Sequence, residues 1–206
     1  MSEFLVIHPE NPQLRLIKQA VKIIQNGGVI IYPTDSGYAL GCQIANKAAL
    51  ERIKQIRQLE DNHNFTLICR NLSALGTYAV LDNAAFRLLK AHIPGPYTFI
   101  LNGTREVPRR LLQPKRNTIG LRVPDNNIVR ALLDELGEPL MSVTLLLPDQ
   151  EYPETDAEDI YNLMKNRVDL VIDGGPCGMT PTTVVDLSEG EVNILRVGKG
   201  DTKNLV

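Results

Sequence analysis

The stretch "IIYPTDSGYALGC", residues 30–42, joins two apolar runs through a short polar connection. Runs rich in β-branched and apolar residues on either side of such a connection are typical of neighbouring β-strands. The connection carries three compact side-chain oxygens, those of Thr34, Asp35 and Ser36. Side chains of this kind often bond their own backbone and so close a turn. From these residues alone the segment is either an ordinary turn, which is the commoner case, or a turn whose side chains face a ligand.

Helical and strand-like patterns alternate from this stretch to both ends of the chain. The spacing of apolar residues predicts a helix over 13–26, ended by "NGG" at 26–28. Further helices are predicted to begin at Asn46, at Asp82, at Asn126 and after Thr155, which forms a capping box with Glu158. Strands are predicted at 29–32, 38–44, 64–69, 98–103, 118–123, 140–147, 169–174, 182–187 and 192–197.

No linker or low-complexity segment divides the chain. Residues 1–206 are therefore expected to form a single α/β domain. The connections between predicted strands range from a tight turn to a full crossover. Because parallel neighbours need crossovers and antiparallel neighbours do not, the sheet is expected to be mixed.

Composition narrows the class of protein. The formal net charge of -2 predicts no general affinity for polyanions, and the absence of Trp disfavours a base-stacking platform. An odd number of scattered cysteines is typical of reduced thiols. No apolar stretch approaches the roughly 20 residues of a membrane span, and the first residues do not resemble a secretory signal. We therefore expect a cytoplasmic protein without a membrane partner.

Several common chemistries have no motif in this sequence. Neither of the usual glycine-rich nucleotide fingerprints occurs, and there is no nucleophile elbow. The three histidines are far apart, and none has a cysteine or carboxylate at metal-ligand spacing. We therefore predict no protein-bound metal and no dedicated catalytic nucleophile. An enzyme with this sequence is expected to act by positioning its substrates and by stabilising charge.

Eight segments, in order along nearly the whole chain, resemble those of the YrdC/YciO family, and the sequence is most similar to its YciO branch. Each segment alone is a weak signal, whereas the ordered series is specific. The segments are "YPTDSGYALGC" at 32–42, "KQIR" at 54–57, "NFTLIC" at 64–69, "PGPYTFIL" at 94–101, "GLRVP" at 120–124, "PLMSVT" at 139–144, "PTTVVDL" at 181–187 and "ILRVGKG" at 194–200.

This resemblance implies a fold and a reaction. The implied fold is a twisted, open, mixed sheet with helices on both faces and a concave, positively charged cavity. The better-known members are threonylcarbamoyl-AMP synthases, which use threonine, bicarbonate and ATP with Mg²⁺ to begin a tRNA modification. Some relatives bind RNA. The expected small-molecule partners are therefore ATP and a small amino acid.

The resemblance also implies site residues. On the amino-acid side, Thr34 would help to hold threonine and Arg122 would meet its carboxylate. Ser142 and Thr182 would line the same pocket. On the nucleotide side, the implied contacts are Lys54, Arg57, Asn64, Thr118, Thr144 and Arg196.

Three departures from the family pattern fall in this implied site. Gln55 replaces the lysine of Lys-x-Arg, although Lys54 is adjacent. The family's Ser-x-Asn appears as Thr-Leu-Leu at 144–146, and leucine cannot donate a hydrogen bond to a phosphate. Cys69 stands where a histidine is common. The resemblance therefore implies a synthase-like protein with weakened activity.

The two arginines within predicted strands and the basic run 105–116 can each be interpreted in two ways. Arg122 and Arg196 each lie between apolar residues of a predicted strand, where a charged side chain needs a partner. Each forms a structural ion pair, or both converge on one anion, which guanidinium groups suit. The basic run 105–116 is a solvated surface or a contact for double-stranded or structured RNA. Its candidate contacts are Arg109, Arg110, Lys115 and Arg116.

Overall fold

The computed structural model describes all residues 1–206 and contains one 10-stranded sheet with the order β1-β8-β2-β3-β7-β4-β6-β5-β9-β10. The strands are β1 (Glu3–Val6), β2 (Ile30–Tyr32), β3 (Ala39–Gln43), β4 (Thr66–Ile68), β5 (Tyr97–Asn102), β6 (Thr118–Arg122), β7 (Leu140–Thr144), β8 (Leu170–Asp173), β9 (Thr183–Asp186) and β10 (Asn193–Arg196).

Neighbouring strands run in both relative directions. The pairs β1–β8, β2–β8, β4–β6 and β5–β9 are parallel. The pairs β2–β3, β3–β7, β4–β7, β5–β6 and β9–β10 are antiparallel. The predicted mixed sheet is therefore confirmed. The strands β2 and β3, which the opening stretch contains, pair with each other near the middle of this order.

Six α-helices and one short 3₁₀ helix accompany the sheet. They are α1 (Leu14–Gln25), α2 (Lys47–Arg57), α3 (Leu72–Tyr78), α4 (Asn83–His92), α5 (Asn127–Leu136), α6 (Ala157–Met164) and η1 (Arg109–Leu111). Asn46 and Asp82 cap α2 and α4 through side-chain oxygens, as predicted, and Asn126 caps α5 in the same way. No helix combines the length and the apolar character that crossing a membrane requires.

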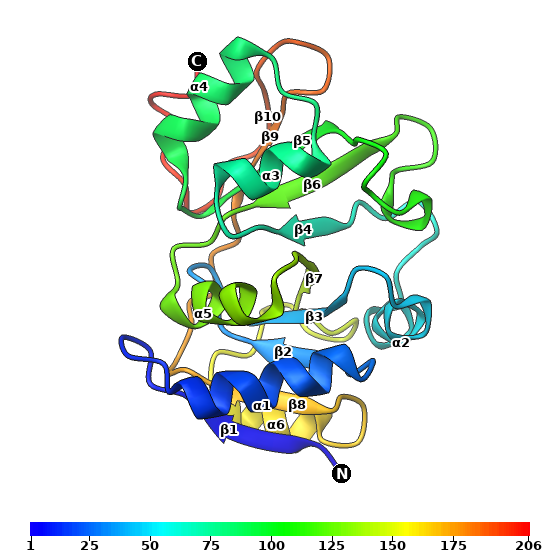
Figure 1. Ribbon diagram of the computed structural model, residues 1–206, viewed down its shortest axis with the longest axis vertical. Helices are drawn as coiled ribbons and strands as arrows, with labels where there is room; N and C mark the ends of the chain where they lie inside the picture. The colour runs from blue at the N-terminus through cyan, green and yellow to red at the C-terminus, as the bar shows by residue number, and fades with distance from the viewer.

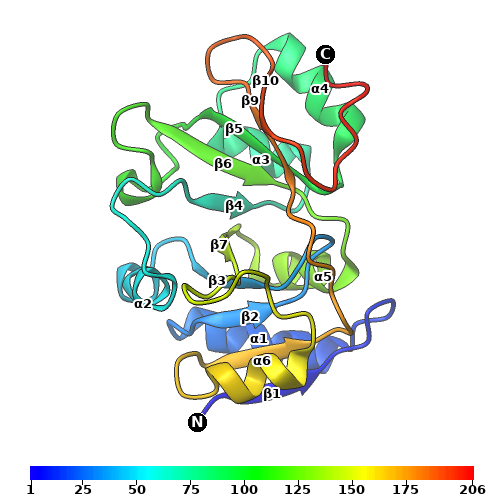
Figure 2. The same cartoon turned by 180° about the vertical axis from the view of Figure 1, so that it is seen from behind.

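The helices cover both faces of the sheet, as expected. Figures 1 and 2 show α1 and α5 on one side of the β2–β3–β8 region and α6 on the opposite side. One core cluster joins apolar residues of α1 and α5 to alternate residues of the strands, including Ile30 and Tyr32. The larger cluster lies on the other face and includes residues of α2, α3, α4 and α6.

Three local predictions were wrong or incomplete. Asp156, not Thr155, caps α6, because its carboxylate accepts the backbone N–H groups of Glu158 and Asp159. The strand predicted over 140–147 ends at Thr144, where a tight turn closes with a hydrogen bond from the Leu146 N–H to the Thr144 carbonyl. Strand β1 and helix α3 were not predicted. The strand β1 pairs only with β8, so its partner is remote in sequence.

Strand alternation divides the residues of the central strands between core and cavity. On β4, β5 and β6, Leu67, Phe99 and Leu121 point into the larger core cluster. Their neighbours Thr66, Thr98 and Arg122 line a cavity instead. The cavity is therefore built on the sheet itself.

Candidate functional site

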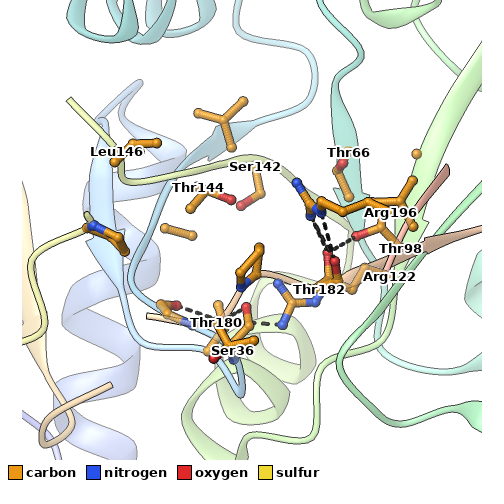
Figure 3. A pocket seen from close by; sticks show the side chains of 18 of the residues that line it. Ser36, Thr66, Thr98, Arg122, Ser142, Thr144, Leu146, Thr180, Thr182 and Arg196 are labelled. Carbon is orange, nitrogen blue, oxygen red and sulfur yellow. Dashed lines mark hydrogen bonds between the residues drawn. The ribbon is translucent and has the colours of Figure 1, made fainter. Parts of the chain in front are cut away.

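A cavity of about 600 Å³ lies over strands β3 to β7, β9 and β10. Its wall also includes the end of α2, the turn at 34–37 and the segments 151–153 and 178–182. Figure 3 shows Arg122, Ser142, Thr182 and Arg196 around this space, each coming from a different segment of the chain. The volume suits a small-molecule ligand.

The turn at 34–37 is closed by its own side chain. The Thr34 hydroxyl donates to the Gly37 carbonyl at 2.6 Å and accepts the backbone N–H groups of Ser36 and Gly37, each at 3.2 Å. The turn interpretation of "PTDSG" is thus correct. Thr34 also lines the cavity, so the same side chain serves the turn and the cavity wall.

Arg122 of β6 is held by Asp35. One guanidinium nitrogen, Nη2, forms an ion pair with the Asp35 carboxylate and lies 3.4 Å from the Thr34 hydroxyl. The same carboxylate accepts the Asp125 backbone N–H at 2.8 Å. Arg122 is only 7% exposed, and its Nε is buried without a hydrogen-bond partner. The structural ion pair is therefore present, and donors of the guanidinium remain unused.

Arg57 reaches the cavity from the last turn of α2. Its Nη1 donates to the Thr144 carbonyl, and its Nε is buried without a partner. Burial lowers the pKa of this guanidinium, because a cation is less stable away from water. An anion placed beside Arg57 would stabilise its charge.

Arg196 of β10 is bound to Thr182. Its Nε and Nη2 donate to the Thr182 carbonyl at 3.0 and 2.9 Å, and Nη2 lies 3.2 Å from the Thr182 hydroxyl. That hydroxyl is 2.8 Å from the hydroxyl of Thr98 (Figure 3). Burial lowers the pKa of Arg196. Arg122 and Arg196 thus line one cavity, although each already has a protein partner.

Ser142 projects from β7 and is fixed by two neighbours. The Tyr32 hydroxyl donates to Ser142 Oγ at 2.6 Å, and Ser142 Oγ donates to the Leu40 carbonyl at 3.2 Å. Burial raises the pKa of Tyr32 to about 12. Tyr32 therefore remains a neutral donor over the whole physiological range.

The structure brings together eight of the ten expected small-molecule contacts. The residues that line the cavity are Thr34, Arg57, Asn64, Arg122, Ser142, Thr144, Thr182 and Arg196. Lys54 does not line it, because its ammonium group turns toward Glu51 and Asp61. Thr118 is buried at the far end of β6 from Arg122 and also lies outside the cavity.

Several cavity residues were not predicted. Thr66 and Thr98 belong to motifs that were recognised, and the alternation of their strands contained the signal that they face away from the core. His63, Tyr152 and Met179 lie on connections between regular elements and carried no comparable signal. The pKa of His63 is lowered mainly by burial and to a smaller extent by the positive charge of Arg57.

The proposed RNA contacts lie outside the cavity. Arg116 binds Asp186 at 2.9 Å and Glu189 at 3.5 Å, and Arg110 donates to the Ile44 carbonyl. Arg109 and Lys115 are exposed. Half of the expected contacts therefore have protein partners, and RNA binding stays a prediction.

The chain is similar in sequence to several known proteins. Residues 22–198 match the family model for Sua5, YciO and YrdC proteins, described as "Telomere recombination". The chain is 60% identical over 203 residues to the uncharacterized protein YciO of Escherichia coli strain K12, covering 98% of each. It is 29% identical over 161 residues to a threonylcarbamoyl-AMP synthase of Vibrio vulnificus, covering 77% of this chain and 86% of the relative.

Solved structures agree with these sequence relationships. The crystal structure of E. coli YciO has a TM-score of 0.96 and 59% identity, and the match covers 100% of both chains. P. abyssi Sua5 complexed with L-threonine has the same fold, with a TM-score of 0.87 at 24% identity over 96% of this chain and 58% of that chain. The eight ordered motifs, the mixed sheet and the full-length match agree, and the chain belongs to the Sua5/YciO/YrdC family.

Proposed function

We propose that the cavity binds a small amino acid beside ATP, and that the protein carries out the threonylcarbamoyl-AMP synthase reaction at a reduced rate. One observation carries this proposal. Arg57 and Arg122 line the same cavity, and each has a buried Nε without a partner. An unpaired buried N–H costs about 1–3 kcal/mol. A ligand with two anionic groups, one near each arginine, would offset both costs once the guanidinium groups turn toward it.

The Arg122 end suits the carboxylate of an amino acid. Arg122 supplies unused donors there, and the Thr34 turn holds the adjacent wall in place. Thr182 adds a hydroxyl that Arg196 and Thr98 already orient. The similarity to a Sua5 structure with bound L-threonine supports threonine as the amino acid.

The Arg57 end suits the phosphates of ATP. Arg57 and Arg196 carry the positive charge, and Asn64 and Thr144 add polar groups. Mg²⁺ would enter as part of the nucleotide substrate. The Asp35 carboxylate is already occupied by Arg122. Ions of this type are often held mainly by substrate phosphates and water.

The proposed reaction needs no protein nucleophile. Threonine and bicarbonate form a carbamate with loss of water, and a carbamate oxygen then bonds to the α-phosphorus of ATP. The bond from that phosphorus to the bridging oxygen breaks, and pyrophosphate leaves with the electron pair. Arg122 would orient the carbamate, while Arg57 and Arg196 would stabilise the charge on the phosphates.

A reduced rate follows from the groups that are missing at the phosphate end. Lys54 turns away toward two carboxylates. Leu145 is buried, and Leu146 reaches the cavity with an apolar side chain. A single preorganised donor can contribute about 10²–10³ in rate. The chain therefore lacks contacts that a faster enzyme would use.

The wider role also remains a proposal. The product would serve tRNA modification in the cytoplasm, with tRNA or double-stranded RNA as a partner. The exposed Arg109 and Lys115 are the basic-run residues left for such contacts. A filter-binding titration at two salt concentrations tests this part separately, because phosphate contacts weaken steeply with salt.

The test of the proposed reaction is pyrophosphate release from MgATP with threonine and bicarbonate. We expect slow, threonine-dependent release, and a loss of about 10²–10³-fold in Arg122→Ala. Arg109→Ala is the matched control, because this arginine is exposed and lies outside the cavity. Release that does not depend on threonine, or that Arg122→Ala leaves unchanged, would contradict the proposal.

A further inference from the structure

The hydroxyl of Ser142 has one free hydrogen-bonding position. A serine hydroxyl has one proton and two lone pairs. Its proton goes to the Leu40 carbonyl, which can only accept, and one lone pair receives the Tyr32 proton. Tyr32 is fully buried, and its hydroxyl donates its hydrogen bond to Ser142 Oγ. Ser142 therefore presents a single lone pair to the cavity that it lines.

Five other polar side chains around the cavity can donate hydrogen bonds. The hydroxyls of Thr98 and Thr182 share one hydrogen at 2.8 Å, so one O–H of the pair remains free whichever of them donates. Arg196 donates to Thr182 and cannot accept. The guanidinium groups of Arg57 and Arg122 also only donate. Ser142 is thus fixed as an acceptor in a cavity wall that also holds these donors (Figure 3).

We infer that Tyr32 is a positioning residue that holds Ser142 as an acceptor, and that this pair selects ligands carrying an N–H group. The ligand class is an α-amino acid or its carbamate, whose nitrogen faces Ser142 while its carboxylate faces the donors. A carboxylic acid of the same shape without nitrogen would leave the Ser142 lone pair without a partner. This inference rests on the proposed function and names the feature by which the site would recognise its amino acid.

The test compares two ligands that differ by the amine alone. L-threonine and (R)-3-hydroxybutanoate share a carbon chain, a carboxylate and a hydroxyl, and only threonine carries nitrogen. Calorimetric titration of the full chain gives the ratio of their dissociation constants. In Ser142→Ala we expect threonine to bind about 2–12-fold more weakly, the equivalent of one hydrogen bond, with the binding of the analogue unchanged.

Tyr32→Phe separates a positioning role from a structural one. Without the tyrosine proton, the Ser142 hydroxyl can rotate and donate to either ligand. The threonine-to-analogue ratio should therefore fall toward that of Ser142→Ala, while the affinity for the analogue is kept or improved. Tyr97→Phe is the matched control, because this buried tyrosine also donates its hydroxyl proton, to the Asp201 carbonyl at 3.0 Å, outside the cavity.

The possible results separate the two proposals. If the wild-type protein binds threonine and both variants keep its selectivity, the inference is overturned and the proposed function stands. If the wild-type protein binds neither ligand, both are overturned. Should Tyr32→Phe fail to fold, Ser142→Ala alone decides, because the affinity for the analogue reports whether its cavity is intact.

Discussion

The two ends of the cavity differ in how firmly their arginines are held. Arg122 rises from the middle of the sheet, is almost wholly buried and is bound to Asp35 beside the self-closed Thr34 turn. Arg57 comes from the end of a helix, is half-buried and makes one hydrogen bond to a backbone carbonyl. The Arg122 end is therefore preorganised by many bonds, whereas the Arg57 end depends on few.

Two of the three departures from the family pattern, at Gln55 and at 144–146, lie at the Arg57 end, whereas Cys69 lies beside Arg122 and donates its backbone N–H to the Arg122 carbonyl at 2.8 Å. At the Arg122 end, every residue that the family resemblance assigns to the amino-acid pocket lines the cavity. These residues are Thr34, Arg122, Ser142 and Thr182. Near Arg57, Lys54 turns outward and Leu146 brings an apolar group. A buried network is costly to alter in parts, because each partner left alone is a buried unpaired group. An open site with few bonds can change residue by residue.

The largest expected effect is on folding stability at the Arg122 end. Arg122→Ala leaves the Asp35 carboxylate without its buried counter-charge, and removing one partner of such a pair costs about 3–5 kcal/mol. Urea unfolding measures this change in the free energy of unfolding. Arg57→Ala should cost clearly less, because its side chain is more exposed. Equal losses in the two variants would remove the contrast between the two ends.

The next effect is on nucleotide affinity at the Arg57 end. A hydrogen bond to a charged group contributes about 1.5–3 kcal/mol, so Arg57→Ala should weaken ATP binding about 10–150-fold. Threonine binding should change much less, which calorimetry can show with each ligand alone. Arg105→Ala, a change at an exposed arginine outside the cavity, provides the control. If Arg57→Ala leaves the affinity for ATP unchanged, the nucleotide does not bind at the Arg57 end of the cavity.

A smaller effect should follow from restoring a polar group. Leu146→Asn places an amide at the cavity wall, and one added hydrogen bond should increase pyrophosphate release about 2–12-fold. Leu145→Asn is the matched comparison, because Leu145 is only 2% exposed and belongs to the core. It should destabilise the fold without a gain in release. A gain from Leu145→Asn instead would mean that this turn has a different arrangement.

The smallest effect concerns pH. Burial and the charge of Arg57 lower the pKa of His63, so below about pH 6.5 the unfolded chain takes up a proton before the folded protein does. Stability should therefore decrease as pH falls from neutral through that range. Urea unfolding at several pH values should show a smaller decrease in His63→Gln. Parallel curves would show that His63 is not responsible.

Local patterns predicted much of the fold. The caps at Asn46 and Asp82 could be predicted because capping is a contact between a side chain and a backbone group three residues away. The mixed sheet followed from the lengths of the connections. The missed strand β1 pairs with β8 more than 160 residues later, and no local pattern encodes such a partner.

Sequence patterns were sufficient to predict most of the elements, several caps, the family and eight residues of the cavity wall, because these depend on neighbouring residues and on the order of motifs. The contacts between distant parts of the chain could be seen only in the folded structure. It paired Arg122 with Asp35 and placed the Tyr32 hydroxyl 2.6 Å from Ser142 Oγ. Those contacts depend on the register of strands far apart in sequence, and a hydrogen bond forms only where register brings donor and acceptor together.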